Sequence, residues 1–285
     1  MKRIAGFAAA LVVVVAACSD APTAPGKNPL IADKALTKQE KNALADSKGV
    51  SRPGAANRSN RQYVSTPPSA VATPMWMLPA VGTDLEMEDD DAQFVCFQFN
   101  FAFFGRNYNC VWVGSNGYLT FDAAFTQFSP TTLPSTPVPH AIIAGAFEDW
   151  LPAFDDEDGN GAVLFYVTGQ APKRRLVVSW VGMAVFGEGD TPRGTFQIQL
   201  MENRGLNMIV LSYQTMSRTQ SHWGTPVTAG VSSGPFTAPG NPPGTMIIGQ
   251  GLTMPALQGH SICLINLGGT YRRFDDTICS IFMLP

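Results

Sequence analysis

The sequence predicts an all-β protein, an antiparallel β-sandwich or a barrel, that follows a signal peptide and a disordered tether. Two observations carry this prediction. From about residue 94 of the 285-residue chain, short stretches of strand-like residues recur, separated by turns rich in glycine and proline. Patterns with the 3.6-residue period of an amphipathic helix are few in the same region. Short strands at regular spacing are typical of sandwiches and barrels.

The first strand is predicted at residues 94–104, FVCFQFNFAFF. Residues on one face alternate with residues on the other, which is the period of a half-buried strand: Phe97, Phe99, Phe101 and Phe103 against Cys96, Gln98, Asn100 and Ala102. GRNYN is predicted to turn the chain into a second strand, CVWVGSNGYLTF, with a kink at residues 114–117.

Further strands are predicted at residues 140–150, 162–169, 174–186, 194–202, 207–214, 227–233, 261–267 and 277–284. Residues 219–271 contain no charged side chain, but their many glycines and prolines argue against a membrane helix. We therefore expect buried strands joined by uncharged loops in this stretch.

The N-terminus predicts export. Residues 1–17 have a basic start and an apolar run, Ile4 to Ala17, which is too short to span a bilayer and indicates a signal peptide. The run ends in Val-Ala-Ala-Cys, which resembles the bacterial lipobox, so Cys18 is predicted to be lipidated. Two acyl chains on one cysteine suffice for stable membrane anchoring. The alternative is an ordinary signal peptide with an incidental cysteine.

Residues 18–75 are predicted to be a flexible tether, and residues 76–285 the folded domain. The tether is rich in proline, alanine, serine and asparagine and nearly lacks aromatic residues, so it cannot bury enough apolar surface to fold. The domain has nine basic and eighteen acidic residues, a net charge of −9. Because nucleic-acid-binding surfaces are basic, this charge argues against nucleic acid as a partner.

Four cysteines remain if Cys18 is lipidated, and an exported chain is expected to pair them as disulfides. Cys263 and Cys279 flank a loop of what the sequence predicts as a final hairpin, so they are expected to pair. If GRNYN is a tight turn, Cys96 and Cys110 lie about 20 Å apart on one strand face, which is beyond disulfide reach. Pairing of these two requires a wide loop or a bent strand, and the alternative joins the first strands to the last.

The acidic stretch DDEDGNG, residues 155–161, has the pattern of the first half of a calcium loop. Asp156, Asp158 and Asn160 supply oxygen ligands at positions 1, 3 and 5, and glycine allows the sharp turn that follows. The bidentate Glu of a full loop is absent, so Asp149, Glu148 or Asp155 is expected to complete the site. The alternative is a solvated hairpin tip, because Asp-Gly and Asn-Gly favour turns.

Other candidate sites have less support. The acidic run at residues 84–91, DLEMEDDD, is either a solvated lead-in to the first strand or another cation site. Paired carboxylates such as Glu148 and Asp149 are also found in glycosidases, but the sequence does not give their separation. The motifs G-x-S-x-G, H-E-x-x-H and C-x-x-C are absent, which argues against nucleophilic or zinc-dependent hydrolysis.

Residues 97–121 resemble the opening of the nidogen-like extracellular domain. They show alternating phenylalanines, a glycine turn, Tyr108, and a strand that ends in an Asn-Gly turn and Phe121. The resemblance continues to about residue 233, through the strands at 142–150, 171–180, 195–200, 209–213 and 229–231. It implies a β-sandwich of the kind found in adhesive and matrix proteins and in many exported bacterial proteins. The resemblance offers no catalytic residues.

We therefore expect a non-enzymatic cell-envelope lipoprotein that presents an adhesion or binding module, with calcium as a stabilising cofactor. Its expected partners are the membrane, through the lipid on Cys18, and an extracellular protein or glycan. Its expected location is the outer membrane or cell surface, with the periplasmic face as the alternative. The alternative function is a carbohydrate-binding or glycoside-hydrolysing domain, which an exposed row of aromatic residues beside Glu148 or Asp155 would favour.

Overall fold

The computed structural model describes residues 75–130, 133, 141–152, 161–189, 191–202, 206–221, 223–235, 244–267 and 270–282. The predicted signal peptide, Cys18 and nearly all of the predicted tether lie outside these residues. The acidic loop with Asp156, Asp158 and Asn160 also lies outside them.

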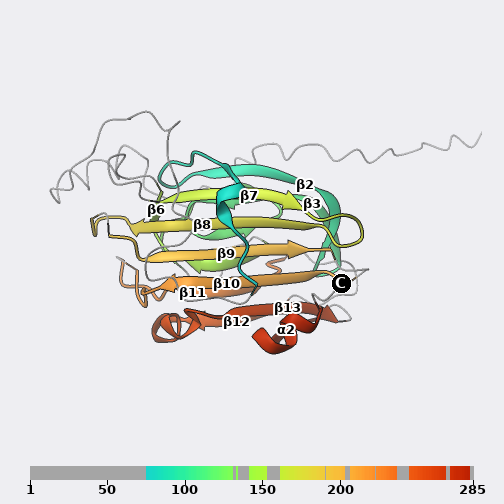
Figure 1. The fold of residues 1–285 in the computed structure, drawn as a ribbon. Coiled ribbons are helices and arrows are strands. Elements are labelled where there is room, and N and C mark those ends of the chain that lie inside the picture. The colour runs from blue at the N-terminus through green and yellow to red at the C-terminus, as the bar shows by residue number, and fades with distance from the viewer. Residues whose placement is uncertain are drawn as a thin grey trace, which may run out of the picture. The chain divides into compact units, whose positions relative to one another are not determined.

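Two antiparallel sheets pack face to face as an open sandwich, as the sequence predicts (Figure 1). The larger sheet has the order β1-β7-β8-β9-β10-β13-β14, with β6 paired to β8, and the smaller has the order β12-β11-β5-β4-β3-β2. The strands of the larger sheet are β1 (Thr83–Asp84), β6 (Trp150–Leu151), β7 (Ala162–Thr168), β8 (Arg175–Val185), β9 (Gly194–Met201), β10 (Met208–Met216), β13 (Ser261–Leu267) and β14 (Thr270–Phe274). Those of the smaller sheet are β2 (Ala92–Phe103), β3 (Arg106–Gly114), β4 (Tyr118–Thr120), β5 (Ile142–Phe147), β11 (Thr228–Ser232) and β12 (Thr245–Gln250).

The alternation of β2 is confirmed. Its four phenylalanines at positions 97 to 103 are at most 4% exposed, and the residues between them face outward. The predicted GRNYN turn is wrong, because the chain reverses over Phe104 and Gly105 alone and Arg106 already belongs to β3. Both turn residues have positive φ, 45° and 81°, as a two-residue hairpin with a right-handed twist requires.

The disulfide between Cys96 and Cys110 depends on an irregular register within this hairpin. Phe101 lies opposite Tyr108, yet Cys96 lies directly opposite Cys110, so β2 carries extra residues between its paired positions. The two Cα atoms are 3.9 Å apart. Of the two geometries that the sequence allows for this pairing, the chain uses the irregular strand and keeps a tight turn.

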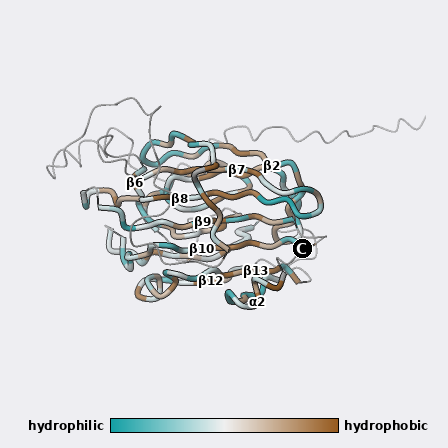
Figure 2. Tube along the Cα trace, viewed as in Figure 1, coloured by the Kyte–Doolittle hydropathy of each residue, from teal (hydrophilic) through white to brown (hydrophobic). Residues whose placement is uncertain are grey.

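The core between the sheets is rich in aromatic residues. Trp180 of β8 stacks on Phe196 of β9 with ring centroids 5.2 Å apart, and both side chains are fully buried. The polar tips of two such residues reach across to the smaller sheet. Trp180 Nε1 donates to the carbonyl of Gly114 (3.1 Å), and the Tyr213 hydroxyl donates to the carbonyl of Gly145 (2.7 Å). Figure 2 shows hydrophobic colours along the strands and hydrophilic colours at many of the turns.

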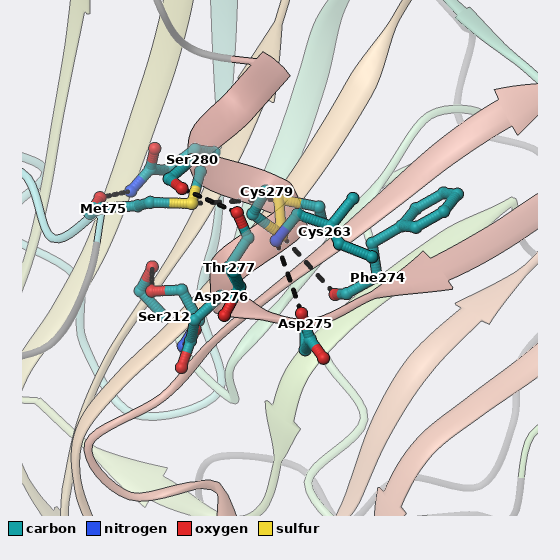
Figure 3. The surroundings of a disulfide bond; sticks show 12 residues. Met75, Ser212, Cys263, Phe274, Asp275, Asp276, Thr277, Cys279 and Ser280 are labelled. Carbon is teal, nitrogen blue, oxygen red and sulfur yellow. Dashed lines mark hydrogen bonds between the residues drawn. A yellow bond between two sulfur atoms is a disulfide. The ribbon is translucent and has the colours of Figure 1, made fainter.

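The C-terminal stretch differs from the prediction. Residues 277–284 were expected to form a strand, but Asp276–Phe282 form helix α2, and the final hairpin is β13 with β14. The expected disulfide is present, and it ties Cys279 of α2 to Cys263 of β13 (Figure 3). In the described part of the chain, no helix is long and apolar enough to cross a membrane.

Two glycines with positive φ allow a matched test of the close contact at the turn between β3 and β4. A Cβ at Gly117 (φ +84°) would lie 2.1 Å from the Ala146 carbonyl oxygen, whereas a Cβ at Gly189 (φ +75°) would meet nothing within 4 Å. We expect Gly117→Ala to lower the free energy of unfolding by about 3 kcal/mol or more, and Gly189→Ala by about 1 kcal/mol. Chemical denaturation measures both. Equal losses of unfolding free energy in the two variants would show that the close approach of the new Cβ to Ala146 does not destabilise the fold.

Candidate metal centre

Three turns meet at one end of the smaller sheet and bring acidic residues together from distant parts of the chain. Residues 89–91 precede β2, residues 115–117 join β3 to β4, and residues 148–149 follow β5. Because β2, β3, β4 and β5 are successive neighbours in the sheet, these turns lie side by side. The Ser115 N–H donates to the carbonyl of Asp91 (2.9 Å), which fixes the first turn against the second.

Asp89, Asp90 and Asp149 form a cluster of carboxylates at this junction. One oxygen of each lies within 4.8 Å of the others. Asp149 is fully buried, and Asp89 and Asp90 are partly buried. At this separation, two negative charges repel by about 3 kcal/mol at an effective dielectric constant of ~20. The cluster therefore favours a ligand that carries positive charge.

Asn116 adds an amide to the carboxylates. Its side chain is fully buried, and its Nδ2 donates to Asp90 Oδ1 (2.8 Å) and to the carbonyl of Gln127 (3.1 Å). Its Oδ1 has no hydrogen-bond partner among the described residues. A buried carbonyl oxygen without a donor costs about 1–3 kcal/mol, so a ligand beside this oxygen would be stabilising, while the nitrogen of the same amide contacts Asp90.

Backbone and indole donors hold Asp149 in place. Its N–H donates to Glu148 Oε1 (2.9 Å), and its carbonyl accepts from the N–H of Phe186 (3.0 Å). Its Oδ2 accepts a 2.8 Å hydrogen bond from Nε1 of Trp223, in the connection between β10 and β11. The Trp223 ring packs against Phe128, with centroids 5.2 Å apart. The carboxylate orientation is thus fixed before any ligand arrives.

Tyr118 lies close enough to the cluster for the charges of its carboxylates to affect the pKa of the phenol. Burial raises the pKa of Tyr118 well above its usual value, and the Asp90 and Asp149 carboxylates raise it further. The phenol therefore stays neutral. Its hydroxyl donates to the carbonyls of Phe125 (2.9 Å) and Gln127 (3.1 Å) rather than to a carboxylate.

Glu148 belongs to a separate, adjoining charge pair. Its carboxylate is fully buried and lies 3.6 Å from Nε of Arg218, whose Nη1 contacts Glu188 at 2.6 Å. Burial raises the pKa of Glu148 to about 7, although the Asp149 N–H and Arg218 act in the opposite direction. Arg218 thus directs its positive charge toward Glu148 and Glu188.

The donor set at the junction suits a hard cation. Three carboxylates and an amide oxygen are ligand types that Ca²⁺ takes in its 6–8-coordinate sites, and zinc sites usually include nitrogen or sulfur ligands. The sequence prediction placed Asp149 in a cation site. The structure brings Asp149 together with Asp89 and Asp90, from the acidic run that was the alternative cation site. Asn116 was interpreted only as a turn residue.

Three tryptophans and a histidine that a binding or catalytic site could use lie elsewhere in the fold. Trp150 and Trp180 are fully buried core residues. Trp112 is partly buried and packs on the half-exposed Phe94, with centroids 4.9 Å apart, on the outer face of the smaller sheet. His260 pairs with Asp276 at the start of α2 (2.9 Å). Trp223 is partly buried and donates to the Asp149 carboxylate, and Asp155 lies outside the described residues.

Comparison with known families now identifies the class of protein that this sandwich represents. The family model described as NIDO related matches residues 62–241, well over half of the chain. The chain belongs to the NIDO-related family, which confirms the resemblance to the nidogen-like domain. No curated protein matches the chain, and no solved structure matches it.

The hydrogen bond between Trp223 and Asp149 can be tested with a matched pair of substitutions. Trp223→Phe keeps a ring but removes the donor to a buried carboxylate, so we expect it to lower the free energy of unfolding by about 1–3 kcal/mol. Trp112→Phe is the control, because Nε1 of Trp112 has no hydrogen-bond partner among the described residues. Urea denaturation should give a clearly smaller loss for the control than for Trp223→Phe. The reverse order would contradict this assignment.

Proposed function

We propose that this chain is a non-enzymatic, lipid-anchored protein of the cell envelope whose NIDO-related sandwich is a calcium-stabilised adhesion or binding module. The observation that carries the proposal is the cluster of Asp89, Asp90 and Asp149 with the buried amide of Asn116. A divalent cation there would replace carboxylate repulsion with attraction. It would also link turns that three separate parts of the chain contribute.

Calcium is favoured over magnesium because of how the two ions accept ligands. Ca²⁺ tolerates irregular sites with several protein oxygens, whereas Mg²⁺ requires near-octahedral geometry and keeps several waters. The described residues offer three carboxylates from two loops. Asp156, Asp158 and Asn160, which follow β6 in the sequence, are proposed as further ligands from the acidic loop.

The N-terminal sequence and the disulfides support the proposed location of the module. The lipobox-like stretch before Cys18 supports a lipid anchor in the outer membrane or at the cell surface. Two disulfides, Cys96–Cys110 and Cys263–Cys279, are consistent with an oxidising compartment. The proposed partner is an extracellular protein or glycan. The glycoside-hydrolysing alternative has less support, because Glu148 and Asp149 are both fully buried and a polysaccharide would not reach them.

Thermal unfolding of the full-length chain tests the proposed cation site. After metal is removed with EDTA, Ca²⁺ at about a hundred times its Kd should add ~2.7 kcal/mol of stability, a rise in Tm of about 5–10 °C. Mg²⁺ at the same concentration should give a smaller rise. Asp89→Asn and Asp149→Asn should lose the Ca²⁺ response, and Glu86→Gln, an exposed carboxylate on the same loop segment, should keep it.

The metal-free variants add a second criterion. Asp89→Asn removes two of the three repulsive pairs in the cluster, so in EDTA its Tm should equal or exceed that of the parent chain. A Tm that does not respond to millimolar Ca²⁺ would rule out the calcium-stabilised module. A response that survives Asp149→Asn would place the cation elsewhere in the chain.

A further inference from the structure

The two ends of the sandwich are built from different connections. The turns that carry the carboxylate cluster lie at one end, which we call the loop end, and the N–H of Phe186 after β8 donates there to the carbonyl of Asp149. The opposite end, which we call the hairpin end, contains the turn between β2 and β3 and the connection between β7 and β8. Both sheets meet there as well, because the Tyr271 hydroxyl of β14 donates to the carbonyl of Ala102 in β2 (3.3 Å).

Basic side chains predominate at the hairpin end. Among the described residues, the basic ones at this end are Arg106, Lys173, Arg174, Arg175 and Arg272, and the acidic ones are Asp122 and Glu202. Arg106 and Arg272 are exposed, and Glu202 is already paired with Arg174 (2.6 Å). The exposed neighbours of Arg106 on β3 are amides, Asn107 and Asn109, rather than acids. This end therefore presents positive charge to its surroundings.

Acidic side chains predominate at the loop end. Among the described residues they include Glu88, Asp89, Asp90, Asp91, Glu148, Asp149, Glu188 and Asp276, and the basic residues there include Arg193 and Arg218. The strand β9 runs from one end to the other with 8 residues, which span about 27 Å at ~3.4 Å per residue. Because the Debye length is about 8 Å at physiological ionic strength, a charged surface that touches one end interacts almost entirely with that end.

The chain enters the described part of the domain near the hairpin end. Met75, the first described residue, packs against a buried cluster that includes Met208 at the start of β10. Its carbonyl accepts from Gln199 Nε2 (2.9 Å), and the carbonyl of Met77 accepts from Gln197 Nε2 (2.5 Å), two residues nearer the loop end. The chain therefore runs away from the hairpin end as it enters, and the residues that precede it in the sequence join the domain on that side.

We propose that the hairpin end faces the membrane and binds the phosphate groups of anionic lipid headgroups, so that the loop end and its candidate cation site point away from the membrane. This inference rests on the lipid anchor proposed above and adds an orientation to it. A lipid surface is the occupant that the entry of the chain favours, because the sequence that leads to Cys18 joins the domain on this side. Residues 19–75 contain eight basic and four acidic side chains, so their net charge has the same sign.

The charges of both ends favour this orientation. A basic side chain beside an anionic surface strengthens attachment about fivefold, and the planar guanidinium groups of Arg106 and Arg272 match the geometry of phosphate. With the hairpin end at the surface, the acids of the loop end lie about three Debye lengths away and are screened. In the reverse orientation they would touch the surface and be repelled. A lipid anchor keeps the domain at a high effective concentration beside the membrane, so a modest attraction is sufficient.

Co-flotation of the full-length chain with lipid vesicles tests the inference. Vesicles of phosphatidylcholine with phosphatidylglycerol should bind the chain more tightly than vesicles of phosphatidylcholine alone, and high salt should remove the difference. Arg106→Gln and Arg272→Gln should each weaken binding to the anionic vesicles about fivefold. Arg193→Gln, which removes the same charge at the loop end, is the control and should not weaken it. Since every variant keeps residues 1–75, their contribution to binding is the same throughout.

Hydrogen–deuterium exchange on the vesicles tests the orientation. Exchange at residues 104–109 of the hairpin end should be slower on anionic vesicles than on phosphatidylcholine, because a bound headgroup layer excludes water from exposed amides. Exchange at residues 223–227 of the loop end should be the same on both. Protection of the loop end instead, or an equal effect of Arg193→Gln and Arg106→Gln on binding, would overturn the inference.

The remaining outcomes separate this inference from the proposed function. If binding does not depend on phosphatidylglycerol, the membrane-facing end is overturned, and the lipid anchor and the calcium-stabilised module stand. If the chain does not bind vesicles but forms oligomers in sedimentation that Arg106→Gln dissolves, the hairpin end binds a second copy of the chain and the inference is again overturned. If the mass of the membrane-extracted chain shows no lipid on Cys18, the anchored protein proposed above fails, and this orientation fails with it.

Discussion

Hydrogen bonds that cross between the sheets at the tips of buried aromatic side chains set the position of the loop end of the sandwich. Trp180 and Tyr213 project from the larger sheet and donate to the carbonyls of Gly114 and Gly145 in the smaller one. Such side chains bury a large apolar area, and leaving their polar tips without partners would cost about 1–3 kcal/mol each. The relative position of the two sheets is therefore restricted.

The same hydrogen bonds also restrict the position of the turns that carry the carboxylate cluster. Gly114 comes just before the turn that carries Asn116, and Gly145 comes shortly before Asp149. The carbonyl of Gly117 accepts from the N–H groups of Gly145 (2.9 Å) and Ala146 (3.3 Å), so that these two turns cannot move apart independently. Three like charges stay together here because the aromatic core, rather than any attraction among them, fixes the backbone that bears them.

The fold class and most strands could be predicted because hydrophobic alternation is a local signal. β2 shows it most clearly, with four phenylalanines spaced by two. The helix α2 could not be distinguished in the same way, since it is only 7 residues long and short apolar runs fit either period. Three strands, β1, β12 and β14, were missed, and all three lie at a sheet edge. β1 has only two residues, β12 lacks an alternating pattern, and β14 carries two arginines at its centre.

The candidate site was only partly predictable because its members are distant in sequence. Asp149 was assigned to a cation site, and the run that contains Asp89 and Asp90 was recognised as acidic, but no spacing rule connects residues about sixty positions apart. The pairing of Cys96 with Cys110 has a similar cause. It depends on a register irregularity in β2, and no turn residue marks that irregularity in the sequence. Strand order and register, rather than local pattern, create both features.

Residues 75–91 cross the outer face of the larger sheet before β2 begins, and this crossing also determines where mechanical load enters the domain. A pull on the chain before Met75 acts first on the hydrogen bonds that the side-chain amides of Gln199 and Gln197 donate to the carbonyls of Met75 and Met77. These bonds lie one after another along the segment, so they are loaded in series and open singly, at low force. The long ladder between β2 and β3 would bear tension only after the pairing of β1 with β7 and the buried Met87 had also given way. Residues 75–82 are thus a short extensible link that yields before the sandwich does.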